Sequence, residues 1–173
     1  MEDPDLLALC LYMEAGGEQG DGQAAVARII KNRMRRRFMS DGTVKGTVLA
    51  KDQFSWAWFA FVQRHTGNAA ADKNQKAYIR IAHTLSEAEK LAEDLKKLTV
   101  PRIYNKCGSI ATAVMIGTYR GEEYDRLTDD AVSYLNPRIL TKLPKWATPD
   151  RLVCSVGRHD FYRAQPLPAP LTS

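Results

Sequence analysis

The chain opens with a helix pattern that is apolar on almost every side. Apolar residues run nearly unbroken from Leu6 to Met13, and Asp3 and Pro4 in front of them suit an N-cap and a first helical position. Gly16-Gly17 is expected to end the helix. A helix without a polar face belongs in the centre of a domain rather than on its surface.

A second helix is predicted from Gln23 to about Arg37, because its apolar residues recur at helical spacing: Val26, Ile29, Ile30 and Met34. This helix ends in a basic cluster made of Lys31, Arg33, Arg35, Arg36 and Arg37. Cations in a last turn complement the helix dipole, so a solvated helix end is the favoured interpretation. The alternative is a patch that binds cell wall polymer or nucleic acid.

The middle of the chain predicts further helices. Residues 43–50 fit a short helix, and the aromatic run over 53–61 is interpreted as core. From 74 to 98, apolar residues spaced three and four apart predict one long amphipathic helix.

The last third predicts a small amount of β-structure. Residues 111–119 are rich in β-branched side chains, which indicates a strand or a buried segment, and short strands are expected near 151–155 and 160–163. We therefore expect an α+β fold, mainly helical, with a small antiparallel sheet. The predicted domain spans residues 1–163, and a Pro-rich tail that does not pack is expected over 164–173.

Composition and charge narrow the protein class. The 173 residues are 45% hydrophobic, which is ordinary for one globular domain. No apolar run is long enough for a membrane span, and the acidic N-terminus does not resemble a secretory signal. The net charge of +5 favours a polyanionic partner. Three widely spaced cysteines fit buried free thiols in a reducing compartment.

Glu14 is the strongest candidate for chemistry in the first helix. It follows Leu7, Cys10 and Leu11 on one helix face, so its carboxylate is expected to lose water. Burial disfavours the charged form and raises the pKa, which is what a glycosidase acid requires. The alternative is a structural glutamate bonded to backbone or to an arginine. Glu18 could support the residues that contact substrate, bind the substrate itself, or be a charged loop residue without such a role.

Other chemistries have weaker support in the sequence. His65, His83 and His159 lie far apart without metal-ligand spacing, so neither a metal site nor an organic cofactor is expected. Cys154 and His159 could form a peptidase pair, but the cysteine does not open a helix and no third partner is evident.

Several separated motifs, in order, resemble the SleB-type cell wall hydrolases, the spore-cortex-lytic enzymes and their phage relatives. The first runs from Leu9 to Glu18 and continues through residues 22–27 and Asn32-Arg33. The later ones are Gln53-Phe54-Ser55-Trp56, Tyr134-x-Asn136-Pro137, Pro144-x-Trp146-Ala147 and Gly157-x-His159-x-Phe161-Tyr162. The chain departs from the family pattern at Gly16, where Arg is usual, and at Leu135, where His is usual.

The resemblance implies a lysozyme-like or lytic-transglycosylase-like fold and cleavage of the peptidoglycan glycan strand, with Glu14 as the catalytic acid. It also implies a set of substrate-binding residues: Glu18, Gln23, Gln53, Ser55, Trp56, Tyr134, Asn136, His159 and Tyr162. Phe54, Trp56 and Phe161 are also core candidates, and for these three the core is favoured. The stretch from 86 to 128 looks expanded relative to the family and could cover the cleft or bind a partner.

The reaction has two expected forms. In a lytic transglycosylase one carboxylate suffices, whereas hydrolysis with two carboxylates needs a partner for Glu14, for which Glu18, Asp21 and Asp52 are the candidates. The favoured interpretation is a monomeric phage endolysin that accumulates in the host cytoplasm and acts on the wall after the membrane is breached. Anionic wall polymer or lipopolysaccharide are further expected partners. The competing hypothesis is a non-enzymatic basic module that binds wall polymer or nucleic acid.

Overall fold

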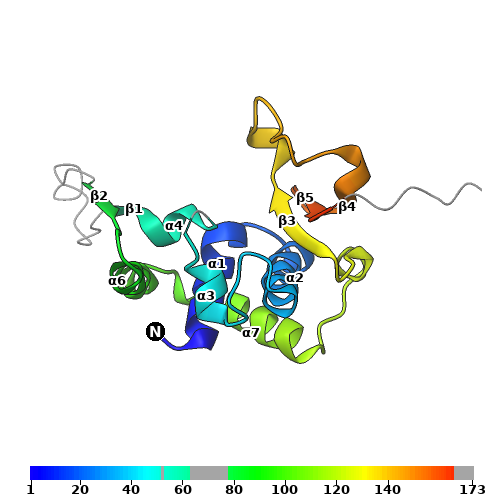
Figure 1. Ribbon diagram of the computed structural model, residues 1–173. Helices are drawn as coiled ribbons and strands as arrows, with labels where there is room; N and C mark the ends of the chain where they lie inside the picture. Colours follow the sequence, from blue (N-terminus) through cyan, green and yellow to red (C-terminus); the bar gives the residue numbers. More distant parts are fainter. Residues whose placement is uncertain (52, 63–77, 166–173) are drawn as a thin grey trace, which may run out of the picture.

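Helix α1 (Asp3–Ala15) forms the centre of a mainly helical fold in the computed structural model, which describes residues 1–51, 53–62 and 78–165 (Figure 1). It packs against α2 (Gly20–Arg36), α3 (Val44–Val48) and α7 (Pro101–Ile116). Leu9, Cys10 and Leu11 are completely buried, as the all-round apolar pattern predicted. The predicted cap was wrong, because Glu2 precedes the helix without a side-chain bond and Asp3 is its first residue.

Helix α2 confirms the predicted apolar stripe but begins at Gly20, three residues earlier than Gln23. Val26, Ile29 and Ile30 on this stripe are fully buried. The predicted short helix corresponds to α3, whose first turn is capped by Thr43, and α4 (Ser55–Trp58) lies in the aromatic run. Phe54 and Trp56 are buried there, as predicted for core residues.

The long helix expected over 74–98 was wrong in its first half. Residues 74–77 lie outside the described residues, and Tyr78–Ile81 form strand β2, which pairs with β1 (Phe59–Val62). Helix α6 (Leu85–Lys97) begins only after Thr84. Thr84 and Glu87 form a reciprocal capping box, which supplies a helix start inside the segment that periodicity alone had treated as continuous.

Residues 111–119 were expected to form a strand or a buried segment, and the strand was wrong because residues 111–116 are the last turns of helix α7. Pro101 stands at the start of α7, and Gly117 ends it with a left-handed backbone at φ 83°. Cys107, Ala111 and Val114 are buried against the rest of the helical core, so packing outweighs the β-branched composition.

A three-stranded antiparallel sheet completes the fold. It consists of β3 (Ala131–Leu135), β4 (Leu152–Val156) and β5 (His159–Arg163), with β5 in the middle. Strands β4 and β5 were predicted and β3 was not. Three short 3-10 helices, Tyr124–Arg126, Pro137–Ile139 and Pro149–Arg151, lie in the connections.

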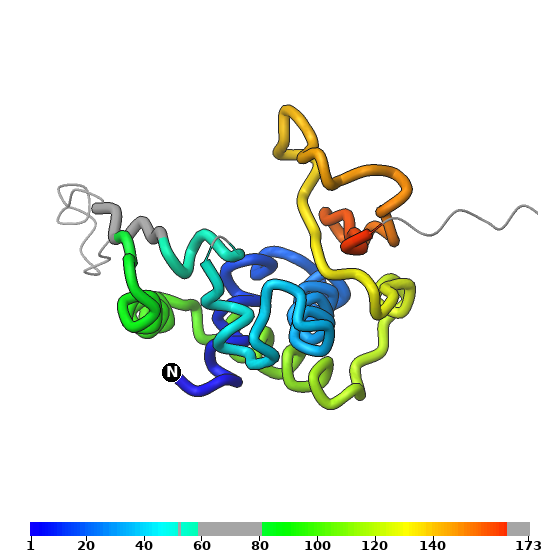
Figure 2. Tube along the Cα trace, viewed as in Figure 1, coloured from blue at the N-terminus to red at the C-terminus, as the bar shows by residue number. Residues whose placement is uncertain are grey.

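The sheet packs on one face of α2 through a second hydrophobic cluster. Ala25 and Ile29 of α2 meet Val156 and Phe161 of the sheet there, all at 0% exposure. Figure 2 shows the yellow-to-red part of the chain gathered at this end, beside the blue helices. The predicted α+β class, mainly helical with a small antiparallel sheet, is therefore confirmed.

Candidate active site

Glu14 lies in the last turn of α1 and faces strand β3. Its Oε2 accepts a hydrogen bond from the Tyr134 hydroxyl at 2.7 Å, across 120 residues of sequence. Burial raises the pKa of Glu14 above its ordinary value. Three neighbours partly oppose this shift in pKa: the Tyr134 hydroxyl, the Arg33 charge and the Trp56 indole N–H. The partner of this half-buried carboxylate is thus a phenol rather than the backbone or an arginine.

Aromatic rings hold Tyr134 in place. Its ring stacks on Phe161 with centroids 5.7 Å apart and meets the His159 ring edge-on at 5.4 Å. Phe161 is fully buried and His159 is 8% exposed, so the phenol is fixed by core side chains of β5. Burial lowers the pKa of His159, which favours its neutral form.

Glu18 lies beside His159, the histidine whose ring meets Tyr134. Its Oε1 accepts from Arg158 Nε at 2.7 Å and lies 3.8 Å from His159 Nδ1, which is too long for a hydrogen bond. Gly157 leaves space for the Glu18 carboxylate. It has φ 59°, and a Cβ at this position would lie 2.7 Å from Glu18 Oε2. Glu18 is therefore a largely buried, ion-paired group beside the histidine.

Arg33 was interpreted from the sequence as part of a solvated basic helix end, and this was wrong. The residue is only 6% exposed, its Nε donates to the Val132 carbonyl at 2.6 Å, and its guanidinium lies over the Phe54 ring. One guanidinium nitrogen has no hydrogen-bond partner among the described residues. Arg33 thus places a buried positive charge near Glu14 and fixes the strand that carries Tyr134.

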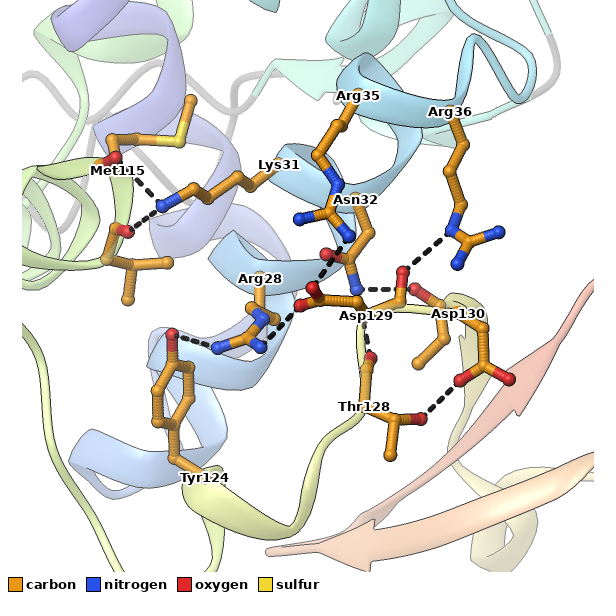
Figure 3. Close-up of polar contacts among 12 residues, drawn as sticks. Arg28, Lys31, Asn32, Arg35, Arg36, Met115, Tyr124, Thr128, Asp129 and Asp130 are labelled. Carbon is orange, nitrogen blue, oxygen red and sulfur yellow. Dashed lines mark hydrogen bonds and ion pairs between the residues drawn. The ribbon is translucent and has the colours of Figure 1, made fainter. Parts of the chain in front are cut away.

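The remaining cations of α2 also bind within the molecule (Figure 3). Arg28 and Arg35 each form an ion pair with Asp129 at 2.6 Å, and Arg36 donates to the Asp129 carbonyl. Lys31 donates to the carbonyls of Val114 and Met115 near the end of α7, where a cation complements the helix dipole (Figure 3). These contacts weaken the case for a free binding patch at this helix end.

Besides His159, three residues expected to bind substrate are buried. Gln23 is 1% exposed and donates to the Ala15 carbonyl, so its amide supports the end of α1. Trp56 is 5% exposed, and its indole nitrogen has no hydrogen-bond partner of normal geometry among the described residues, although it acts on the pKa of Glu14. Tyr162 is 3% exposed and meets the Trp146 ring edge-on.

Three others lie closer to solvent. Ser55 is exposed at the start of α4, and Gln53 is half-buried just before it. Asn136 follows β3, and its side chain accepts from the Arg138 N–H at 3.0 Å, which caps the next 3-10 helix. Whether these residues contact substrate remains a prediction.

The candidates for a second carboxylate are occupied or outside the described residues. Asp21 accepts from the Tyr119 hydroxyl at 2.8 Å and from the backbone N–H groups of Glu123 and Tyr124. Asp52 lies outside the described residues. Glu18 is thus paired with Arg158 and Asp21 is held by three donors, whereas Glu14 accepts from the Tyr134 hydroxyl and has a pKa raised by burial.

Neither a thiol nor a metal offers a competing centre in the described part of the chain. All three cysteines are free, and burial raises the pKa of Cys154, the reverse of an activated thiolate. The described residues contain no group of three or more His, Cys, Asp or Glu side chains arranged for a metal ion.

The two departures from the family pattern have local explanations. A Cβ at Gly16 would lie 2.4 Å from the Tyr12 carbonyl oxygen, so the helix end has no room for the usual arginine. Leu135 is 8% exposed and packs with Ala147 and Tyr162, so an apolar contact stands at the position of the usual histidine.

The described site is a half-buried carboxylic acid on a central helix that accepts a hydrogen bond from a phenol of a small sheet, and its raised pKa gives it the chemistry of a proton donor. The model of the Cell Wall Hydrolase family matches residues 17–162. The chain therefore belongs to this cell wall hydrolase family, as its motifs predicted. Glu14 itself precedes the matched region by three residues.

Two solved structures are similar to the chain at low identity. One is the catalytic domain of the germination-specific lytic transglycosylase SleB from Bacillus anthracis, with 22% identity, 93% of each chain covered and a TM-score of 0.47. The other is the catalytic domain of Bacillus cereus SleB, with 22% identity, 93% and 89% covered, and a TM-score of 0.44. A comparison with curated proteins gives no match.

Sequence reasoning singled out Glu14 but not Arg33, the buried cation near it. The signal was present, because Asn32-Arg33 belongs to the opening motif and Arg33 lies four residues after Ile29 on the buried stripe. Asn32 is buried too and donates to the Ala131 carbonyl at 2.9 Å. This adjacent pair therefore joins α2 to β3.

Proposed function

We propose that the chain cleaves the glycan strand of peptidoglycan between N-acetylmuramic acid and N-acetylglucosamine as a lytic transglycosylase, with Glu14 as acid and then base. The observation that carries this proposal is the hydrogen bond of 2.7 Å between the Tyr134 hydroxyl and a carboxylate whose pKa is raised by burial. Membership of the cell wall hydrolase family supports peptidoglycan as the substrate. The contacts and burial of Glu14 support its role as the acid.

The first step is transfer of the Glu14 proton to the glycosidic oxygen as the bond to the muramic acid C1 breaks. The leaving sugar departs as an alcohol, and the ring carries oxocarbenium character. Glu14 becomes a carboxylate in this step, and the Tyr134 hydroxyl stabilises the new charge by donating to it. The Arg33 charge and the Trp56 N–H also favour the charged form of Glu14.

In the second step the C6 hydroxyl of the same muramic acid attacks C1. Glu14 accepts the hydroxyl proton, so the carboxyl group returns to its starting state and a 1,6-anhydro ring forms. No water is consumed and one carboxylate performs both transfers. The engagement of Glu18 by Arg158 and of Asp21 by Tyr119 supports this single-acid route over hydrolysis with two carboxylates.

The test is mass spectrometry of the fragments released from purified peptidoglycan. Wild type is expected to release anhydro-muramic ends, Glu14→Gln to lose at least about 100-fold in rate, and Glu18→Gln to keep most of the rate with the same products. Reducing muramic ends from the wild type would refute the transglycosylase route. Cleavage by Glu14→Gln at the wild-type rate would refute the assignment of the acid.

The proposal extends to the biological role, as a monomeric phage endolysin whose catalytic unit spans residues 1–163. Family membership and the net charge of +5, which would attract anionic wall polymer or lipopolysaccharide, support it. No helix in the described part of the chain is long and apolar enough to span a membrane. Expression in a bacterial host tests the role: lysis only when a pore-forming protein opens the membrane is expected, and lysis without one would contradict it.

A further inference from the structure

The connection between β3 and β4, residues 137–151, combines exposed apolar and cationic side chains. We call this segment the β3–β4 arm, and Figure 1 shows it extending away from the helices, from yellow into orange. Its apolar side chains are unusually open: Ile139 is 76% exposed, Leu143 is 46% exposed and Trp146 is 38% exposed. Exposed apolar residues gathered in one segment indicate a surface that binds something.

The charge of the arm is concentrated and unpaired. It carries four cations, Arg138, Lys142, Lys145 and Arg151, against one acid, Asp150, which is a net +3 within a chain of +5. None of these four cations forms an ion pair within 4 Å among the described residues. In contrast, the cations of α2 are held by Asp129 and by backbone carbonyls.

The arm is anchored to the sheet by its own contacts. Ala147 is buried against Leu135 and Tyr162, and the Trp146 ring meets the Tyr162 ring edge-on at 5.5 Å. Asn136 caps the 3-10 helix at its start. These contacts fix the arm to the sheet, while its cations and its exposed apolar side chains can contact another molecule.

We propose that the β3–β4 arm docks the protein on the surface of a bilayer that contains anionic glycerophospholipids. Cations beside apolar side chains match such an interface, where phosphate groups bind the charges and the acyl boundary takes up Ile, Leu and Trp. A polysaccharide or a nucleic acid would satisfy the cations but leave Ile139 and Leu143 in water. A second copy of the arm would bring two segments of +3 together, which opposes self-association through this surface.

The test measures co-sedimentation of the full chain with vesicles of phosphatidylglycerol in phosphatidylcholine and with vesicles of phosphatidylcholine alone. Wild type is expected to bind the anionic vesicles in a salt-sensitive manner. Lys142→Gln with Lys145→Gln should weaken binding roughly 25-fold, since each cation near an anionic surface contributes about fivefold. Ile139→Ser with Leu143→Ser should weaken binding roughly tenfold through loss of apolar insertion.

The matched control is Arg102→Gln with Lys106→Gln, which removes two exposed cations of α7 that form no ion pair among the described residues. This control is expected to bind the vesicles nearly as well as wild type. Thermal melting of each variant separates loss of binding from loss of fold. Cleavage of lipid-free glycan strands should be unchanged in all three double variants.

Four results would overturn the proposal. They are equal wild-type binding to both kinds of vesicle, wild-type affinity in both arm variants, and an equal loss of affinity in the α7 control. The fourth is an arm variant that keeps vesicle binding but loses cleavage of lipid-free strands or loses a dimer present in the wild type. That last result would assign the arm to the substrate or to a second copy.

Discussion

Replacing Tyr134 with Phe tests how the structure tunes its acid. The change removes one hydroxyl and keeps the ring that stacks on Phe161 and meets His159 edge-on. The hydroxyl lies 2.7 Å from Glu14 Oε2, and it donates to that oxygen when the carboxylate is charged. Hydrogen bonds to a charged group contribute about 1.5–3 kcal/mol, so the balance between charged and protonated Glu14 should shift about 10- to 150-fold towards the protonated form.

The sign of the pH effect follows from the role of the acid. A general acid works only when protonated, so the rate should fall as pH rises through the pKa of Glu14. Tyr134 stabilises the charged form and therefore lowers this pKa, against the larger effect of burial that raises it. Tyr134→Phe should move the falling limb of the pH profile to higher pH. The rate of Tyr134→Phe on the plateau below this limb should also drop, because the carboxylate formed in the transition state loses a hydrogen-bond donor.

The assay is the initial rate of release of anhydro-muramic fragments from purified peptidoglycan, measured across pH for each variant. Tyr104→Phe is the matched control, because the Tyr104 hydroxyl also donates to a carboxylate, that of Asp5 at 2.9 Å, at the opposite end of α1. The control should reproduce the wild-type profile. A falling limb for Tyr134→Phe at the wild-type pH, or below it, would refute the tuning of Glu14 by Tyr134.

Three further predictions concern stability. The raised pKa of Glu14 means that its folded state holds the proton more tightly, so this group costs stability as pH rises through its unfolded and then its folded pKa. Glu14→Gln should therefore melt at a higher temperature than wild type at neutral pH, and calorimetry should show the gain vanishing in acid. Arg33→Met should lower the free energy of unfolding in urea by about 1.5–3 kcal/mol, since it leaves the Val132 carbonyl without its charged donor; a loss near zero would show that the contact contributes nothing. Gly157→Ala should cost more than Gly117→Ala: both residues have positive φ, but the first adds a contact with a carboxylate at 2.7 Å and the second meets nothing within 4 Å. Equal unfolding midpoints for the two alanine variants would contradict this order.

The local sequence was sufficient to predict the helices whose position follows from their own pattern of apolar residues. Apolar residues all around α1 left only a central position for that helix, and they also predicted that Glu14 would lose water. The buried stripe of α2 followed from the same periodicity. In these elements a single periodicity and its end signals determine both the helix and its buried side.

The wrong predictions concern segments whose structure depends on contacts with residues distant in the sequence. The β-branched content of 111–119 indicated a strand or a buried segment, and packing of α7 against α1 outweighed the strand propensity. Strand β3 escaped prediction because its register depends on pairing with β5, about 30 residues later. Arg33 resembled its basic neighbours, and only the approach of Val132 and Phe54 makes it a buried residue.

The bond between Glu14 and Tyr134 joins residues that are 120 positions apart, and this has a consequence for biosynthesis. Closing so long a loop has an entropic cost that contacts of shorter range lack. A ribosome that has released only the first helices has already produced the acid, but the strand that carries the phenol and its neighbour β5 have yet to emerge. A growing chain therefore remains without the hydrogen bond between Tyr134 and Glu14 until nearly the whole domain has been translated.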